Sequence, residues 1–437
     1  MRHIGLLLLV LALTTCSLFE QKASLIIALP PSPASTTASR SGGPAVRMIS
    51  ALTAKFRITV SGGDLASPIV TEIAGSPSPT TATIYLPGSG TYNVTADGLD
   101  SSDVALTSGS ATIDAVPGVN YVTIVMLPVN PFKLYVSNRT DGTVSVLNGV
   151  DGSAITTIAV AAAPIAIGVN PVTRKVYVAH FGADISVIDG STDTVSTTIP
   201  YAAFGDFPSV GINPGANKVY AAWQYDGTPS VQIIDGVTDT LGTPYSANTY
   251  PTSIAFNTAT NKVYVLDWGS SDIQVLDGTT DGLLTTILSI SSTEKCGIAA
   301  NSATNKIYFT DGAASGSVYV VDGSTDTVLA TPIPVGGNLT GPDEGASVAV
   351  NSITNRIYVT NSLDNTVSVI DGLTETVIAT INVGTAPRGV AVSRNYNKVY
   401  VVNRLDATIS IIDGATNTVT NTVSVGVEPQ FIGVLGD

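Results

Sequence analysis

Apolar and polar residues alternate along most of this chain in short runs, and Gly, Asn and Asp separate the runs. The clearest stretch begins near residue 347. Its period of two predicts four β-strands, at residues 347–350, 356–360, 366–370 and 377–381. Turn-forming residues lie between these strands, as in antiparallel hairpins. The stretch therefore predicts a four-stranded antiparallel unit.

This unit recurs along the chain. A tyrosine in the motif Lys/Arg-x-Tyr marks each copy, at Tyr135, Tyr177, Tyr220, Tyr264, Tyr308, Tyr358 and Tyr400. The intervals are 42, 43, 44, 44, 50 and 42 residues, which is the repeat length of a β-propeller with four strands per blade. We expect the tyrosines to pack between blades. The first strand of each unit also carries a Gly or Ala between branched residues, which suits crowded strands near the axis.

The two ends of the repeat region complement each other. The first copy starts directly at its tyrosine strand, Lys133–Val136, and the chain ends with an unpaired inner strand, Pro429–Val434. Joining these ends in one blade gives seven complete blades and removes exposed sheet edges. The sequence therefore predicts an all-β protein with a seven-bladed β-propeller over residues 131–437, closed by the C-terminal strand.

A smaller all-β region precedes the propeller at residues 51–130. Alternating runs predict strands at 55–60, 82–86, 90–94 and 121–125, with Gly and Pro between them. These features indicate a small antiparallel β-sandwich. Leu86–Gly88 and Tyr92–Ala96 resemble transthyretin-like or carboxypeptidase-regulatory sandwiches. A spacer and a binding module are both compatible with this region, and a spacer is the simpler interpretation.

The N-terminus has the pattern of an export signal. A basic start, Arg2 and His3, precedes an apolar run over residues 4–13 that is too short to span a bilayer in the folded protein. Leu13–Cys16 resembles the lipobox of bacterial lipoproteins, which implies a signal peptide at 1–16 and lipid attachment at Cys16. Ordinary cleavage nearby or an uncleaved anchor are the alternatives. Residues 17–50 have the composition of a flexible Pro/Ser/Thr-rich linker.

The composition of the chain restricts the kinds of partner and site that can be expected. The net charge of −14 and only 19 Lys and Arg residues argue against nucleic-acid binding, which needs clustered basic residues. Of the two cysteines, Cys16 lies in the signal, so no internal disulfide framework is expected. Only two histidines are present, and His3 lies in the signal, which excludes multi-histidine metal sites. We expect no cofactor and no metal.

The repeats also carry a family signature. Tyr358–Asn361 spells YVTN, and Tyr135–Asn138 and Tyr400–Asn403 are close variants. Together with Val369–Asp371 and Val383–Pro387, these residues resemble the repeat of the YVTN-family, YncE-like propellers. The resemblance covers about 300 residues and implies the propeller fold. It does not imply a function, because such folds host many functions.

One face of the predicted propeller varies between repeats. It holds the loops between second and third strands and the linkers between blades, where binding specificity usually lies. The candidate ligand-binding residues on this face are Asn138, His180, Trp223, Asp267, Asp311, Asn361, Arg388, Asn403 and Glu428. Alternatively, the Asn and Asp residues only cap turns.

The opposite face carries repeated Asn-x-x-Thr-Asn-Lys and Asp-Gly-x-Thr-Asp turns. Their spacing differs from that of a calcium loop. We expect local ion pairs between the Lys and Asp residues, each contributing about 0–1 kcal/mol if exposed.

These features favour a non-enzymatic binding or scaffold protein, exported to the periplasm or outer surface and held in the cell envelope by a lipid anchor. Its loop face would contact a protein, a glycan or a small ligand. The alternative is a lactonase-type hydrolase at the channel mouth, with His180 as general base beside Asp267, Asp311 or Glu344.

Overall fold

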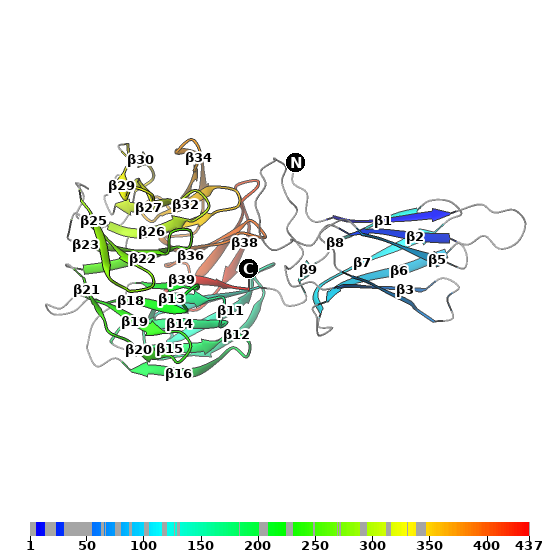
Figure 1. Cartoon of the computed structure of the whole chain (residues 1–437), viewed down its shortest axis with the longest axis horizontal. Helices are drawn as coiled ribbons and strands as arrows, with labels where there is room; N and C mark the ends of the chain where they lie inside the picture. Colours follow the sequence, from blue (N-terminus) through cyan, green and yellow to red (C-terminus); the bar gives the residue numbers. More distant parts are fainter. Residues whose placement is uncertain are drawn as a thin grey trace, which may run out of the picture. The chain divides into compact units, whose positions relative to one another are not determined.

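The computed structural model shows an all-β chain in two compact units, Met1–Pro131 and Phe132–Asp437 (Figure 1). The residues that it describes are 6–13, 23–29, 55–62, 65, 67–74, 80–86, 90–99, 105–115, 120–125, 127–128, 132–182, 184–200, 209–223, 230–247, 250–268, 270, 272–288, 295–311, 316–329, 331–337 and 347–436.

The first unit contains two antiparallel sheets. One has the order β5 (Thr80–Leu86), β2 (Ala23–Leu29), β1 (Leu6–Leu13) and β8 (Asn120–Val125). The other has the order β4 (Ile69–Ala74), β3 (Lys55–Gly62), β6 (Gly90–Leu99), β7 (Ala105–Ala115) and β9 (Leu127–Pro128). The predicted strands correspond to β3, β5, β6 and β8. Alternation in β3 and β6 buries Ile58, Val60, Tyr92 and Val94.

Two strands of this unit lie where the sequence predicts other structure. Strand β1 falls within the predicted signal peptide, and β2 falls within the predicted flexible linker. Both runs are apolar, and Ile26 and Ile27 favour extended backbone, so each can pair as a strand. Cys16 and most of the linker lie outside the described residues. The sandwich packing, the signal and the lipid attachment stay predictions.

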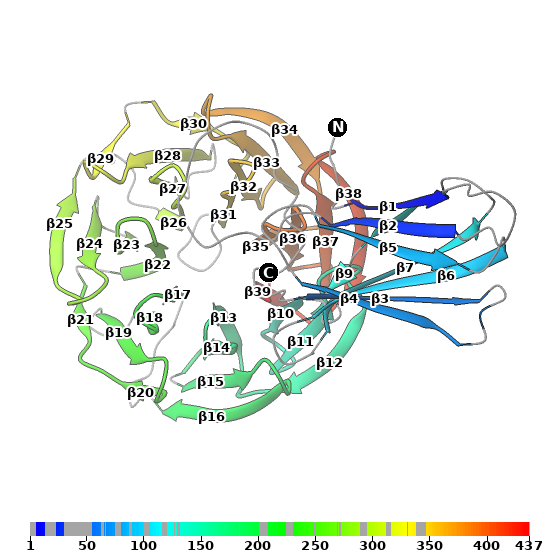
Figure 2. The same cartoon turned by 45° about the vertical axis from the view of Figure 1, so that its right-hand side comes forward.

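The second unit is a ring of seven four-stranded antiparallel blades (Figure 2). Blade 1 contains β39 (Pro429–Leu435), β10 (Lys133–Asn138), β11 (Thr143–Asn148) and β12 (Ala154–Ala159). Blade 2 contains β13 (Pro164–Asn170), β14 (Lys175–His180), β15 (Asp184–Asp189) and β16 (Thr194–Pro200). Blade 3 contains β17 (Val210–Asn213), β18 (Lys218–Trp223), β19 (Ser230–Asp235) and an outer strand split into β20 (Thr240–Leu241) and β21 (Tyr245–Ser246).

The remaining blades repeat this order. Blade 4 contains β22 (Tyr250–Asn257), β23 (Lys262–Trp268), β24 (Ile273–Asp277) and β25 (Leu283–Ile287). Blade 5 contains β26 (Lys295–Asn301), β27 (Lys306–Asp311), β28 (Ser317–Asp322) and the split pair β29 (Thr327–Val328) and β30 (Ile333–Pro334). Blade 6 contains β31 (Val348–Asn351), β32 (Arg356–Asn361), β33 (Thr366–Asp371) and β34 (Thr376–Asn382). Blade 7 contains β35 (Pro387–Ser393), β36 (Lys398–Asn403), β37 (Thr408–Asp413) and β38 (Thr418–Ser424).

The last strand closes the ring as predicted. Strand β39 pairs antiparallel with β10, with Gly433 opposite Tyr135 and Pro429 opposite Asn138. The first blade is thus built from both ends of the propeller sequence. The seven-bladed ring and its closure by the C-terminal strand are confirmed.

The core lies between the blades. All seven repeat tyrosines are fully buried, and each apolar cluster joins neighbouring blades. Tyr177 and Val187 of blade 2, for example, pack with Val219 and Ile234 of blade 3. A Cβ atom added at Gly168 would lie 2.4 Å from Cγ1 of Val210. The small residue of one inner strand therefore makes room for a branched residue of the next blade.

The innermost strands place apolar side chains around the axis. In the innermost strand of each blade, the residue after the small Gly or Ala has a half-buried side chain. These residues are Val169, Ile212, Phe256, Ala300, Val350, Val392 and Val434. Each also packs against an apolar cluster between blades. The wall of the axis is therefore apolar at this level.

Candidate binding faces of the propeller

The two ends of the ring differ in the segments that form them. We call the end with the turns between strands 1 and 2, and between strands 3 and 4, the turn face. The other end, which we call the loop face, carries the turns between strands 2 and 3 and the linkers between blades. All nine predicted ligand residues belong to the loop face.

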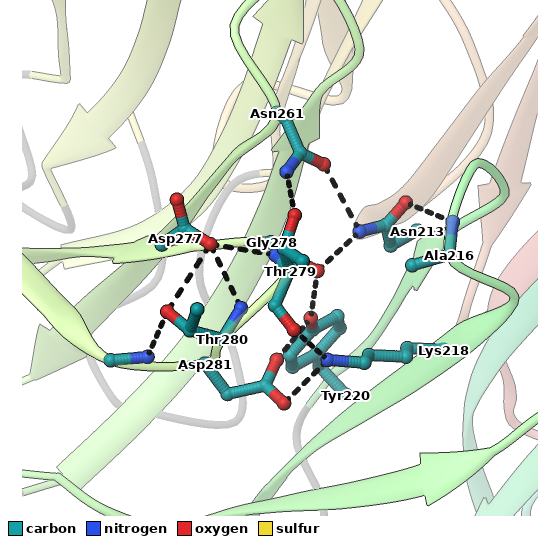
Figure 3. Close-up of polar contacts among 11 residues, drawn as sticks. Asn213, Ala216, Lys218, Tyr220, Asn261, Asp277, Gly278, Thr279, Thr280 and Asp281 are labelled. Atoms are coloured by element: carbon teal, nitrogen blue, oxygen red, sulfur yellow. Dashed lines mark hydrogen bonds and ion pairs between the residues drawn. The ribbon is translucent and has the colours of Figure 1, made fainter.

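The turn face joins neighbouring blades through side chains, as the junction of blades 3 and 4 shows (Figure 3). Asp281 of blade 4 accepts two bonds from blade 3. Its Oδ2 lies 2.6 Å from Lys218 Nζ, and its Oδ1 accepts the Tyr220 hydroxyl at 2.7 Å. The Lys218 and Asp281 side chains are only 22% and 20% exposed. Burial, and then the bond to Asp281, raises the pKa of Tyr220, so its hydroxyl stays a proton donor.

The same turn is shaped by its own aspartate. Asp277 Oδ1 accepts the N–H groups of Thr279 and Thr280, both at 2.8 Å (Figure 3). Those bonds lower the pKa of Asp277, which keeps it ionised. From blade 3, Asn213 Nδ2 donates to the Gly278 carbonyl at 3.0 Å. The turn is thus tied to the preceding blade at both of its ends.

We call the Lys–Tyr–Asp arrangement the inter-blade clamp. It recurs at three other junctions, as Lys133 and Tyr135 with Asp193, Lys175 and Tyr177 with Asp239, and Lys262 and Tyr264 with Asp326. The expected ion pairs are therefore present, but they are not local. They connect blades, because each acid belongs to the blade after its lysine. The paired side chains are mostly shielded from solvent.

The clamp changes beyond blade 5. Lys306 pairs with Glu375 of blade 6, and the Tyr308 hydroxyl has no hydrogen-bond partner in the described chain. At the next junction Asn417 occupies the acid position, and Arg356 instead pairs with Asp371 of its own blade.

The junction of blades 7 and 1 has no acid in the clamp position. There, Lys398 donates to the Val150 carbonyl, and the Tyr400 hydroxyl donates to the Gly149 carbonyl at 2.5 Å. Phe132 packs between Tyr396 and Tyr400, with ring centroids 4.6 and 6.2 Å away. Backbone carbonyls and aromatic packing thus replace the ion pair.

On the loop face, the predicted asparagines are buried. Asn138 donates through Nδ2 to Thr143 and Ser145 at 3.0 and 2.9 Å, and its Oδ1 accepts the Gly426 N–H at 3.1 Å. Asn403 makes the same bonds to Thr408, Ser410 and Gly384, and Asn361 donates to Thr366 and Ser368. All three side chains are fully buried. Their geometry is that of the turn-capping alternative.

Aspartates three positions later complete this capping. Asp141, Asp364 and Asp406 each accept a backbone N–H from the linker before their blade, from Val427, Gly337 and Thr385, at 2.6–2.7 Å. The linker must approach the asparagine closely: a Cβ atom at Gly426 would lie 2.5 Å from Asn138 Cγ. Blades 6, 7 and 1 therefore hold their loops and linkers in one fixed arrangement.

His180 takes the asparagine position in blade 2. Its side chain is 1% exposed, and Nε2 lies 2.9 Å from the Ser186 hydroxyl. Burial lowers the pKa of His180 to about 4, against opposing effects of the Ala162 backbone and Asp184. The imidazole is thus neutral at pH 7. Asp267 and Asp311 belong to blades 4 and 5, and Glu344 lies outside the described residues.

Two further strand-end candidates, Asp267 and Asp311, are also enclosed. Asp267 is fully buried, and Asp311, at 6% exposure, accepts the Ser317 N–H at 2.7 Å. The backbone of Trp223 pairs with Ser230, but its side chain lies outside the described residues. Within the described chain, no group of three or more His, Cys, Asp or Glu residues is arranged to hold a metal ion. The described elements also include no membrane-spanning helix.

Two predicted residues belong to the segments that lead into blades 7 and 1. Arg388, 6% exposed, bonds Gln430 through Nη1 and lies 5.4 Å over the Phe431 ring. Glu428 is more exposed. Its Oε2 accepts the Thr140 hydroxyl at 2.7 Å, and its Oε1 lies 3.2 Å from Arg404 Nη2. The bond from Thr140, followed by that from Arg404, lowers the pKa of Glu428.

The nine predicted residues do not include the exposed apolar side chains of this face. Phe181, Leu363, Leu405 and Val427 are 52%, 49%, 65% and 49% exposed, and the Arg139 guanidinium lies 5.7 Å over the Phe181 ring. Their signal is an apolar residue in a loop of otherwise polar, turn-forming residues. Reading only the polar residues for chemistry overlooks it.

Comparisons with known proteins agree with the fold. Residues 337–435 match the family model described as YNCE-like beta-propeller. Among solved structures, a chain of Kuenenia stuttgartiensis hydrazine synthase is similar, with a TM-score of 0.57 and 16% identity, over 64% of this chain and 92% of that one. A functionally unknown protein from Desulfotomaculum acetoxidans is similar, with a TM-score of 0.58 and 12% identity, over 70% of this chain and 99% of that one. At these identities the likeness shows the fold alone. The chain matches no curated protein in sequence.

Proposed function

Since residues 132–437 form a seven-bladed β-propeller, of which residues 337–435 match a YNCE-like family model, we propose that the chain is a non-enzymatic binding protein of the cell envelope that presents its loop face to a protein partner. The fold by itself supports a binding or scaffold role in general. The face, the kind of partner and the location are the proposal.

The contrast between the two faces carries this proposal. On the turn face, the recurrent Lys, Tyr and Asp side chains are engaged in joining blades. Both faces expose apolar side chains, such as Leu373 on the turn face and Leu405 and Phe181 on the loop face. On the loop face these side chains lie in loops that differ between blades and accompany part-exposed arginines. Aromatic and arginine side chains are enriched in protein interfaces. Linker length also varies on this face, from the short 160–163 to the long 335–347.

The geometry gives the hydrolase alternative little support. His180 is neutral and enclosed, and its described hydrogen bond goes to Ser186 of its own blade. The carboxylates proposed to assist it belong to blades 4 and 5. The axis is lined by apolar side chains, which offer no acid or base at that level.

A pull-down from envelope extract tests the binding role. The full chain would be compared with two loop-face variants, Tyr250→Arg and Leu405→Arg, and with the turn-face variant Leu373→Arg. These positions are 48%, 65% and 84% exposed, so each variant should fold. We expect a specific partner to be lost from at least one loop-face variant and retained by Leu373→Arg. The proposal would be contradicted if the chain recovers no specific partner, or if neither loop-face variant recovers less of the partner than the wild type.

Membrane anchoring is tested separately. We expect the exported chain to fractionate with membranes and a Cys16→Ser variant to leave that fraction. A wild-type chain that is already soluble after export, or a variant that stays with the membrane, would rule out lipid attachment at Cys16.

A further inference from the structure

The turn between the third and fourth strands of blade 1 differs from the equivalent turn of the other six blades. In those blades the turn begins with Asp–Gly, at Asp189, Asp235, Asp277, Asp322, Asp371 and Asp413. In blade 1 it begins with Asn148 and Gly149, the only Asn–Gly pair in the sequence. Asn148 nevertheless caps its turn in the same way. Its Oδ1 accepts the Val150 N–H at 2.8 Å, as Asp277 Oδ1 accepts the Thr279 N–H.

The Asn148 turn also joins blade 1 to blade 7. The Tyr400 hydroxyl donates to the Gly149 carbonyl at 2.5 Å, and Lys398 Nζ donates to the Val150 carbonyl. These two carbonyls replace the acid of the inter-blade clamp. Their positions depend on the covalent geometry of the backbone at residues 148–150.

An asparagine followed by glycine is prone to deamidation, because glycine has no Cβ atom to hinder ring closure. The Gly149 nitrogen would lose its proton and attack Asn148 Cγ, forming a C–N bond, while Nδ2 takes up a proton and leaves as ammonia. Water then opens the resulting succinimide at either carbonyl. One opening gives aspartate, and the other gives isoaspartate, in which the chain continues through the former side chain.

The closed ring opposes this reaction. Gly149 is buried, and its N–H donates to the Phe132 carbonyl at 2.7 Å. The Phe132 ring fills the space beside Gly149, where an added Cβ atom would overlap it. The bond to Val150 also holds the Asn148 side chain. The nitrogen can attack only when these contacts open, and the population of such a locally open state depends on the stability of the surrounding contacts.

We propose that Asn148 is a deamidation site whose reaction is gated by the junction of blades 7 and 1. The aspartate product matches the other six turns and leaves the junction closed. The isoaspartate product adds a methylene to the backbone before Gly149, which displaces the carbonyls that Tyr400 and Lys398 bind. Isoaspartate at this position therefore loosens the blade that closes the ring. This chemistry is independent of the proposed binding role.

Peptide mapping of the full chain by mass spectrometry tests the proposal. Folded protein and protein unfolded in guanidinium chloride would be incubated in mildly alkaline buffer, and electron-transfer fragmentation would distinguish aspartate from isoaspartate at position 148. We expect Asn148 to react before every other asparagine in the unfolded chain, and to react more slowly in the folded chain. A different asparagine reacting first, or equal rates in both states, would overturn the proposal.

Two tyrosine variants show which junction controls the rate. Tyr400→Phe removes the hydrogen bond to the Gly149 carbonyl, so the turn should open more often and Asn148 should deamidate about fivefold faster. Tyr220→Phe removes the equivalent hydroxyl at the junction of blades 3 and 4, and this matched control should react at the wild-type rate. An unchanged rate in Tyr400→Phe, or the same increase in both variants, would contradict gating by the closing junction.

Asn148→Ser tests the structural consequence. Serine keeps a turn-capping oxygen and cannot form the succinimide. Folded wild type and variant would be incubated together until isoaspartate is detected at position 148 of the wild type. The Tm of the wild type should then fall in proportion to its isoaspartate content, and that of Asn148→Ser should stay constant. A wild-type Tm that does not change as isoaspartate accumulates would show that the modification leaves the ring closed.

Discussion

The junction of blades 3 and 4 and the junction of blades 7 and 1 join similar sheets by different means. The first uses a shielded ion pair and a tyrosine hydrogen bond on the turn face, centred on Asp281. The second has no acid there, and relies on aromatic packing around Phe132 and on the Arg404–Glu428 pair at the loop face. This junction also borders blade 1, which contains strands from both ends of the propeller sequence. The clamp is thus absent at the closing junction, after changes at the two junctions before it.

The largest effect should come from opening the closing blade. Deleting residues 429–437 removes the inner strand of blade 1, including the buried Ile432 and Leu435. Since the ring then has free edges, we expect it to lose most of a domain's stability, which is on the order of 5–15 kcal/mol. Thermal unfolding followed by circular dichroism measures this. A truncated chain that melts like the wild type would show that closure contributes little.

His180, which takes the position of the capping asparagines in blade 2, should make the stability of the fold depend on pH. The folded pKa of His180, about 4, lies below its ordinary value of 6.5. The unfolded chain therefore binds the proton first, and stability falls as the pH drops from about 6.5 through 4. The loss should be on the order of 2–3 kcal/mol. Urea unfolding across this range would measure it, and His180→Asn, which copies the asparagine of blades 1, 6 and 7, should flatten the dependence. An unchanged slope would contradict the neutral, buried imidazole.

Two tyrosines allow the clamp to be tested with a matched control. Tyr220→Phe removes the hydroxyl that donates to Asp281, so we expect a loss of about 1–2 kcal/mol. Tyr308→Phe removes a hydroxyl without a hydrogen-bond partner in the described chain, so its effect should stay within about 0.5 kcal/mol. Chemical unfolding of both variants gives the comparison. Equal losses would mean that the clamp hydrogen bond adds nothing.

Restoring the acid at the junction of blades 6 and 7 should stabilise the ring. Asn417 already has the positive φ of 55° that the clamp aspartates share, so Asn417→Asp needs no change of backbone. The new carboxylate would face Arg356 of blade 6, and we expect a gain of about 0.5–1 kcal/mol. Differential scanning calorimetry would detect the rise in Tm. A lower Tm would mean that the asparagine is required there.

The smallest effect should come from the loop-face pair at the closing junction. Glu428→Gln weakens the bond to Arg404, and because this pair is partly exposed we expect a loss of about 0.5 kcal/mol or less. The folded pKa of Glu428 is lowered from 4.5. Its contribution is therefore present above pH 4.5 and is lost as the pH falls through the folded pKa. Wild type and variant should converge in acid, and a difference that persists at low pH would contradict the assignment.

The sequence predicted the ring well because its evidence is local and repeated. Each strand shows a period of two, and Tyr135 and its six equivalents mark the repeat. The closure of blade 1 by β39 could also be predicted, because the first repeat lacks an inner strand and the C-terminal end of the sequence supplies one. The export signal and the lipid anchor stay predictions.

The candidate site was harder to predict because its chemistry depends on contacts between blades. Lys218 and Asp281 are separated by 63 residues, so no local pattern shows that they meet. Asn138 and His180 were chosen as polar residues at strand ends, and the same positions bury them as caps. The exposed Phe181 and Leu405 follow the cap positions His180 and Asn403 closely, and only the fold shows that their loops share one face of the ring.

The central claim is that the turn face joins the blades while the loop face binds a partner. Site-specific photo-cross-linking in intact cells tests it most directly, with the photoreactive residue placed once at Leu405 and once at Leu373. We expect a discrete cross-linked adduct from position 405 and none from position 373. An adduct from position 373 alone, or equal adducts from both positions, would contradict it.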